Sequence, residues 1–192
     1  STLVKDVLFP AIKRKLKDYS FKPAPCQSIE LPIYHDIKDV EYVDQNSIKK
    51  SSKSIPITYI NSFDSIRILY ANQRESKINN LSPKHFSFNT HGGRCETCKG
   101  QGSIVIEMQF LSDINIKCEI CNGYKYQDKV LKIKYSNLNI YELLNLTIED
   151  GYKFFVKNNQ QSIAQNIHPL IKVGLGYLQM GQTINSLSSG EL

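Results

Sequence analysis

Four cysteines in two closely spaced pairs limit the folding of this chain more than any other feature. Cys95 and Cys98 form one Cys-x-x-Cys pair, Cys118 and Cys121 form the other, and 19 residues separate the two pairs. Two such turns are typical of a site in which four thiolates surround one zinc ion. Because four thiolates leave no open coordination position, we expect the zinc to be structural and not catalytic.

Two disulfides or a redox dithiol would also use paired cysteines. The first residues have no charged stretch ahead of an apolar run and no small-residue cleavage site, so we expect no secretory signal. In a reducing cytosol, clustered cysteines are more often metal ligands than disulfides. We therefore expect a cytoplasmic protein with a zinc site. Cys26 has no partner at ligand spacing and is predicted to be a free thiol.

The composition suits a globular protein with a modest positive charge. The chain has 192 residues, enough for one ordinary domain or two small lobes. No apolar run approaches the roughly 20 residues that cross a bilayer, so we expect no membrane contact. Lysine and arginine total 24 against 18 acidic residues, a formal charge of +6. That excess is compatible with nucleic acid, and equally with a solvated basic face.

Hydrophobic periodicity predicts a mixture of helices and short strands, an α+β fold. Helices are expected at residues 3–16 with a break at Pro10, at 61–72 after a cap at Asn61 or Ser62, and at 163–173. A further helix should begin after Thr147, with Asp150 completing a capping box. Strands are expected at residues 40–44, 103–110 and 130–135. The composition changes at residues 79–83, where a lobe boundary is predicted.

The two Cys-x-x-Cys turns form the first knuckle (Cys95–Cys98) and the second knuckle (Cys118–Cys121). The first knuckle resembles the zinc repeat of DnaJ-type co-chaperones. Gly100 and Gly102 follow Cys98 at the spacing of that repeat, but Lys125 replaces the last glycine in the second knuckle. Two repeats occur here, whereas a DnaJ-type region has four. One alternative is therefore a zinc-stabilised protein-docking or co-chaperone-like module without direct DNA contact.

A second resemblance covers nearly the whole chain. It is carried by residues 86–89, 92–95, 106–111, 147–150, 173–178 and 187–191. In order and spacing these blocks resemble the second nucleotide-binding half of the UvrA family of excinuclease ABC proteins, the damage-sensing ATPases of bacterial nucleotide excision repair. The resemblance implies a partial ABC-type ATPase lobe with an inserted β-rich zinc module. Residues 1–80 would form the partial ATP-binding lobe, 81–160 the zinc-binding insertion (signature domain), and 161–192 a helical return to the ABC signature motif.

The same resemblance implies nucleotide contacts. Ser1 and Thr2 match the residues that follow the Walker A lysine, and Gln45 matches the Q-loop. Ser188, Ser189 and Gly190 match the ABC signature, which contacts ATP across a head-to-head dimer. The resemblance therefore implies ATP and magnesium as cofactors of the full-length protein. Walker B and the Walker A lysine are absent from these 192 residues, so we expect no ATP hydrolysis by this chain alone.

DNA contacts are also implied by the resemblance. In the family, two basic residues and a proline follow the Q-loop, and Lys50, Lys53 and Pro56 match them. Arg94 and Lys99, beside the cysteines, are further candidates for phosphate contact. A solvated charge run remains the alternative for the lysines. The expected function is DNA damage recognition in nucleotide excision repair, with damaged double-stranded DNA, a second copy of the protein and the other excinuclease subunits as partners.

Overall fold

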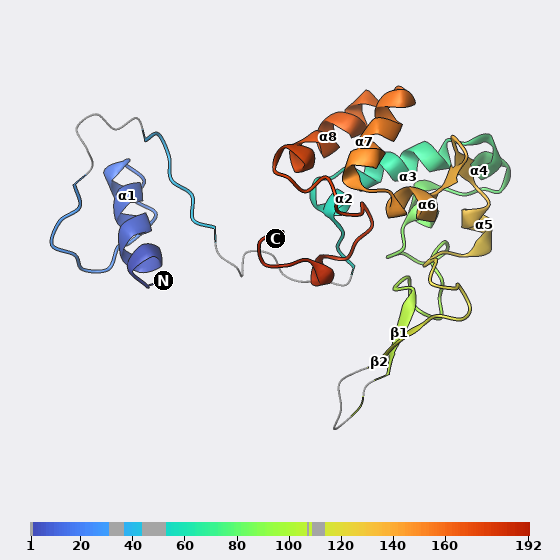
Figure 1. The fold of residues 1–192 in the computed structure, drawn as a ribbon, viewed down its shortest axis with the longest axis horizontal. Coiled ribbons are helices and arrows are strands. Elements are labelled where there is room, and N and C mark those ends of the chain that lie inside the picture. The colour runs from blue at the N-terminus through green and yellow to red at the C-terminus, as the bar shows by residue number, and fades with distance from the viewer. Residues whose placement is uncertain (1, 31–36, 44–52, 107, 109–113) are drawn as a thin grey trace. The chain divides into compact units, whose positions relative to one another are not determined.

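The computed structural model describes residues 2–30, 37–43, 53–106, 108 and 114–192, and it divides the chain into two compact units, residues 1–49 and 50–192 (Figure 1). The predicted site residues Ser1, Gln45 and Lys50 lie outside the described residues. Within them, no helix is long and apolar enough to cross a membrane.

The described part of the first unit contains one continuous helical stretch and non-helical chain that packs on it. A π-helical stretch, η1 (Leu3–Leu8), continues into α1 (Phe9–Lys15), with Pro10 in its first turn. The ring of Phe9 contacts Phe21 and Tyr42 at centroid distances of 5.0 and 5.6 Å. The strand predicted at residues 40–44 is wrong over Val40–Val43, where the described chain forms no ladder. Tyr42 packs against the helix instead.

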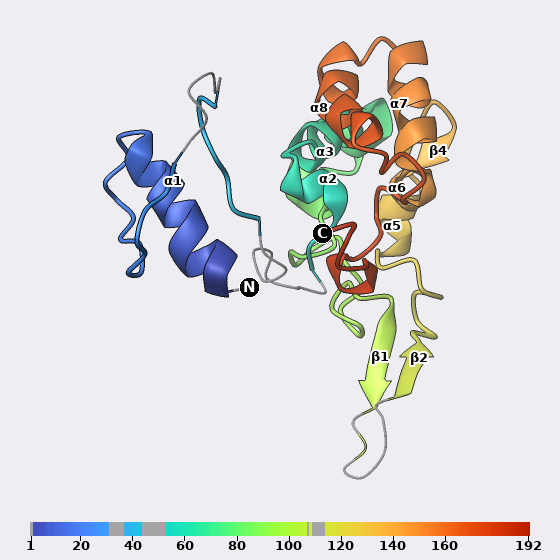
Figure 2. The same cartoon turned by 60° about the vertical axis from the view of Figure 1, so that its left-hand side comes forward.

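The second unit is mainly helical. Its first half contains α2 (Pro56–Tyr59), α3 (Phe63–Ala71), α4 (Arg74–Ile78) and the 3₁₀ turn η2 (Pro83–Phe86). Its second half contains α5 (Asp128–Leu131), α6 (Ile140–Asn145), α7 (Ile148–Lys157), α8 (Gln161–Lys172) and the 3₁₀ turn η3 (Ile184–Ser186). Helices α7 and α8 pack side by side, as Figures 1 and 2 both show.

The described residues of the second unit also form two small antiparallel sheets. Strand β1 (Ser103–Ile106) pairs with β2 (Ile114–Lys117), and β3 (Lys134–Tyr135) pairs with β4 (Leu138–Asn139). The β1–β2 ribbon extends away from the helices (Figure 2). Helices with small sheets confirm the α+β class. The predicted strand at 130–135 is largely wrong, because its first residues form α5 and only Lys134 and Tyr135 pair.

A row of buried aromatic side chains joins the helices to the segment that precedes the first cysteines. Tyr70 packs on Phe86 at 5.7 Å, and its hydroxyl donates to the carbonyl of Leu138 at 2.9 Å. The hydroxyl of Tyr126 donates to the carbonyl of Phe86 at 3.1 Å. Each buried hydroxyl thus has a partner, which removes the penalty for burying it. Helix α3 and the segment around the cysteines therefore share one core.

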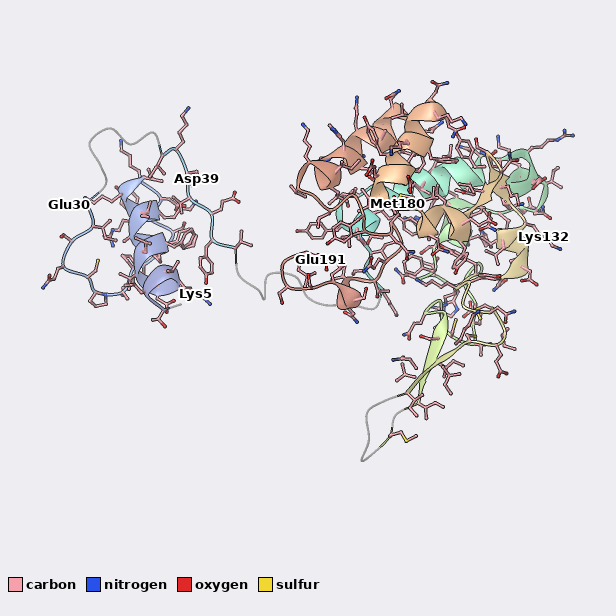
Figure 3. The ribbon with its side chains drawn as sticks, in the orientation of Figure 1. Lys5, Glu30, Asp39, Lys132, Met180 and Glu191 are labelled. Carbon is pink, nitrogen blue, oxygen red and sulfur yellow. The ribbon has the colours of Figure 1, made fainter. Side chains whose placement is uncertain are left out.

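The segment after α8 returns to the start of α7. The amide of Ile148 donates to the carbonyl of Leu178, and the amide of Met180 donates to that of Leu146. Met180 is fully buried among the helices of this unit (Figure 3). A Cβ on Gly151 would lie 2.5 Å from its sulfur, so the glycine leaves room for this packing.

The domain boundaries predicted at residues 80 and 160 stay a prediction. Helix α3 lies before the first of them, yet its Tyr70 contacts Phe86 and Leu138 beyond it. The return segment likewise pairs with residues 144–149 across the second. Residues 50–192 form one compact unit in this structure.

The predicted caps are confirmed in part. Thr147 caps α7 without the reciprocal bond of the predicted capping box, and Ser62 stands at the start of α3. Ser62 is the N-cap residue of α3, but its hydroxyl makes no capping bond. Thr147 caps α7: its Oγ1 accepts from the amide of Asp150 at 3.0 Å and donates to the Asp150 carboxylate at 2.8 Å. This geometry confirms the predicted helix start.

We expect Thr147→Ala to lower the free energy of unfolding by about 1 kcal/mol, because an amide at the start of α7 loses its acceptor. Thermal or urea unfolding measures the change, with Thr147→Ser as the matched control that keeps the hydroxyl. Equal stability of the alanine and serine variants would contradict the capping role.

Candidate metal centre and nucleic-acid interface

The four paired cysteines converge at one point in the second unit. Cys95, Cys98, Cys118 and Cys121 are all buried, and their Sγ atoms lie within 4.8 Å of one another. Cys95 and Cys118 are 3.9 Å apart, and Cys98 and Cys121 are 3.6 Å apart. Zinc–sulfur bonds of about 2.3 Å in a tetrahedron require sulfurs about 3.8 Å apart. The cluster therefore fits a tetrahedral metal ion.

The two cysteine turns have the same backbone shape. Each contains three residues with positive φ at matching positions, Lys99, Gly100 and Gly102 in the first and Asn122, Gly123 and Lys125 in the second. Lys125 thus adopts, at φ 70°, the left-handed conformation that glycine adopts in the first turn. Its ammonium lies 5.6 Å from the ring centre of Phe88. This cation–π contact offsets part of the cost of the left-handed conformation of Lys125. The replacement of the last glycine by Lys125 in the second knuckle therefore leaves the sign of φ at that position unchanged.

The main chain supplies polar partners to the sulfurs. The amide of Gly102 donates to the Sγ of Cys98 at 3.2 Å. A hydrogen bond from the amide of Cys121 lowers the pKa of Cys118 to about 7, whereas burial raises the pKa of Cys121 to about 12. Buried thiols of this kind resist ionisation unless a cation is present. Burial raises the pKa of Cys98 and of Cys121, so a bound metal ion would favour the thiolate forms of these two residues.

The first knuckle is held against the preceding loop at very close range. A Cβ on Gly93 would lie 1.7 Å from the carbonyl oxygen of His85, which leaves room for a hydrogen atom alone. The carbonyl of Gly93 accepts from the amide of Gln127, and the amide of Cys95 donates to the carbonyl of Lys125, each at 2.8 Å. These bonds join the two cysteine segments beside the sulfurs.

Arg94 is an internal residue. It is 7% exposed, and its guanidinium donates to the carbonyl of Asn89 at 3.0 Å and to the carboxylate of Glu96 at 3.2 Å. The Arg94 side chain is 8% exposed, so little of the guanidinium is open to a DNA phosphate. Its position instead favours a structural role between the loop and the knuckle, a role that spacing alone did not indicate.

The described lysines predicted to contact DNA lie on the surface. Lys99 is exposed on the turn of the first knuckle. Lys53 is exposed too, and its carbonyl accepts from the side-chain amide of Asn89 at 3.0 Å. Two exposed cations are thus placed on segments that are linked to the metal site.

Of the residues predicted to contact nucleotide, the structure describes Thr2 in the first unit and Ser188, Ser189 and Gly190 in the second. Ser188, Ser189 and Gly190 are exposed in a turn of the second unit, whereas Thr2 is exposed in the first. The carboxylate of Glu191 closes the turn by accepting from the amide of Ser188 at 2.6 Å and from the hydroxyl of Tyr177 at 2.5 Å. The Tyr177 bond lowers the pKa of Glu191, whose position is shown in Figure 3. Sequence reasoning missed Tyr177 because it lies 14 residues away.

Curated relatives match this chain along its whole length, although no protein-family model matches it. The chain is 42% identical to UvrABC system protein A of Clostridium acetobutylicum over 191 residues, which is 100% of this chain and 20% of that protein. The corresponding proteins of Listeria monocytogenes and Helicobacter pylori are 41% and 40% identical, with the same coverage. The crystal structure of UvrA2 from Deinococcus radiodurans matches with a TM-score of 0.72 and 37% identity, covering 78% of this chain and 18% of that chain. This chain therefore spans about a fifth of the length of the curated relatives it matches.

We expect one tightly bound metal ion per chain. Cys118→Ser should lower the bound metal strongly, because the fourth soft ligand is lost. Cys26→Ser makes the same chemical change at an exposed cysteine of the first unit and should retain the metal. Elemental analysis after dialysis measures both, and equal metal content in the two variants would contradict the four-thiol site.

We also expect Gly93→Ala to destabilise the second unit by about 2 to 3 kcal/mol, because the added methyl group meets a main-chain carbonyl that cannot move aside. Gly176→Ala is the matched control, since its Cβ would meet neighbours at an ordinary 3.6 Å. Urea unfolding of the metal-loaded protein compares them. Similar midpoints would show that the loop at His85 yields easily.

Proposed function

The chain belongs to the UvrA family, and on that premise we propose that it serves DNA damage recognition in nucleotide excision repair, as part of the ATP-dependent DNA-binding component of the excinuclease. The observation that carries the proposal is similarity at 40–42% identity over the whole chain. The four-thiol cluster adds support, since it was identified from cysteine spacing without regard to that similarity.

Zinc is the metal proposed for the cluster. Cys95, Cys98, Cys118 and Cys121 would hold it, and four thiolates suit zinc better than magnesium or calcium, which prefer oxygen ligands. A zinc ion with four protein ligands has no position for water or substrate, so its role would be to stabilise the fold. That role suits residues 86–127, where the β1–β2 ribbon contributes little buried apolar surface because all of its described isoleucines are at least 42% exposed.

ATP and magnesium would act in a longer, dimeric protein. Ser188, Ser189 and Gly190 would face the nucleotide of a second copy, and Ser1, Thr2 and Gln45 would lie near phosphate and magnesium. The turn at Ser188–Gly190, closed by Glu191, supports this role because its residues are exposed. Without a Walker A lysine and Walker B among its residues, this chain would not hydrolyse ATP alone.

Lys50, Lys53 and Lys99 are the residues proposed to contact DNA. Lysine contacts to phosphate position a duplex without reading its sequence, which suits a protein that responds to many lesions. Arg94 is proposed to support these contacts and not to make one, because its guanidinium is occupied within the protein.

A protein-docking or co-chaperone-like zinc module is the less favoured function. That function accounts for the knuckles alone, whereas the similarity to UvrA-type proteins extends over helices α3 and α6–α8 as well. The proposed partners in repair are damaged duplex DNA, a second copy and the other excinuclease subunits.

We expect Lys50→Ala/Lys53→Ala in the full-length protein to weaken binding to damaged and undamaged duplexes alike. The slope of log K against log salt should become shallower by about 2, because two phosphate contacts are lost. Fluorescence anisotropy across a salt series measures both quantities. Lys129→Ala/Lys132→Ala is the matched control, with the same charge change and spacing on exposed residues in and after α5.

An equal loss in both double variants would indicate that net charge alone drives binding. No loss in either would indicate that Lys50 and Lys53 are solvated surface charges. It would also remove support for direct DNA contact by these lysines.

A further inference from the structure

Lys53 and Ser54 form a short segment that is anchored from two sides. The carbonyl of Lys53 accepts from the side chain of Asn89, and the carbonyl of Ser54 accepts from the amide of Ile184, each at 3.0 Å. The next residue, Ile55, is fully buried. The main chain beneath the exposed Lys53 side chain is therefore held in place, although the residue is on the surface.

The Asn89 anchor leads directly to the metal site. Its side chain donates to Lys53, which is 36 residues away in sequence, while its carbonyl accepts from the guanidinium of Arg94. Arg94 immediately precedes the metal ligand Cys95, and its own carbonyl accepts from the side chain of Gln127 at 3.0 Å. Two consecutive hydrogen bonds thus connect the residue beside the metal ligand to the main chain of Lys53.

The Ile184 anchor leads to a different segment. Ile184 is buried in η3, four residues before Ser188. Its bond to Ser54 involves two main-chain groups, so it does not depend on the identity of a side chain. Asn89 supplies the side-chain part of the anchoring, and it can be removed by substitution without touching either Lys53 or a cysteine.

We propose that Asn89 is a positioning residue for DNA binding, which holds Lys53 at a set place relative to the metal centre so that its ammonium meets a backbone phosphate. This inference rests on the proposed function, because it assumes that Lys53 contacts DNA. A lysine on a fixed main chain loses less conformational freedom when it binds than one on a loose loop, so removing the anchor weakens the contact without removing the charge.

The test is a double-mutant cycle in the full-length, zinc-loaded protein, with duplex DNA affinity measured by fluorescence anisotropy across a salt series. Asn89→Ala should weaken binding about threefold, the effect of one neutral hydrogen bond. In a Lys53→Ala background the same change should have almost no further effect, since its action passes through Lys53. Asn79→Ala is the matched control: its side chain also donates to a main-chain carbonyl, that of Glu75, but within one helical turn of α4.

Hydrogen exchange adds a second measurement. Asn89→Ala should speed exchange in the peptide that contains Ser54 and Ile55, whereas Asn79→Ala should leave it unchanged. If Asn89→Ala loses its metal or unfolds, Asn89→Ser and Asn79→Ser replace the pair, because serine keeps a small polar side chain that is too short to reach Lys53.

The outcomes separate this inference from the proposed function. If Lys53→Ala weakens binding and Asn89→Ala does not, the positioning role is overturned while the lysine contact stands. If the two losses multiply in the double variant, Asn89 acts independently of Lys53 and the inference is again overturned. If Lys53→Ala itself has no effect, the DNA contact fails and the inference fails with it.

Discussion

The convergence of four buried cysteine sulfurs at one point is the constraint on which the middle of this chain depends. Their sulfurs converge within 4.8 Å, in surroundings that raise the pKa of Cys98 and Cys121 through burial. A bound cation would offset that cost and would link two segments that are distant in sequence. The first knuckle also lies directly on the preceding loop, where Gly93 closely approaches the carbonyl of His85.

The metal site and the helices are stabilised by different interactions that meet at a few residues. Tyr126 follows the second knuckle and donates to Phe86, whose ring packs on Tyr70 of α3. The knuckles are thereby joined to the apolar core. The position of a surface residue near the knuckles therefore depends on the metal site and on the helical core. Lys53 is such a position, because Asn89 connects its main chain to Arg94 beside the first ligand.

Predictions from local spacing and capping succeeded where neighbouring residues supply the energy. Thr147 caps α7 because the amide it satisfies is three residues away. The predicted strand at residues 130–135 was wrong because alternation of apolar residues does not reveal whether a partner strand exists. Val130 and Ile133 are buried, but Val130 lies on a helical turn and Ile133 follows shortly after it. Arg94 was predicted as a candidate for phosphate contact, and its partners within the protein, Asn89 and Glu96, are not evident from charge clustering.

The sequence by itself determined the four-cysteine cluster, the start of α7 and the mixed fold class, since each depends on spacing within a few residues or on the strong preference of paired thiols for one metal ion. Only the tertiary structure decided that Arg94 is buried, that Tyr177 bonds to Glu191 and that Asn89 anchors Lys53. Those contacts join residues whose separation in the chain carries no regular pattern. Their partners are set by the packing of the whole unit, which brings groups distant in sequence within hydrogen-bond reach. At Arg94 burial adds the need for a partner, because an unpaired buried guanidinium would be costly.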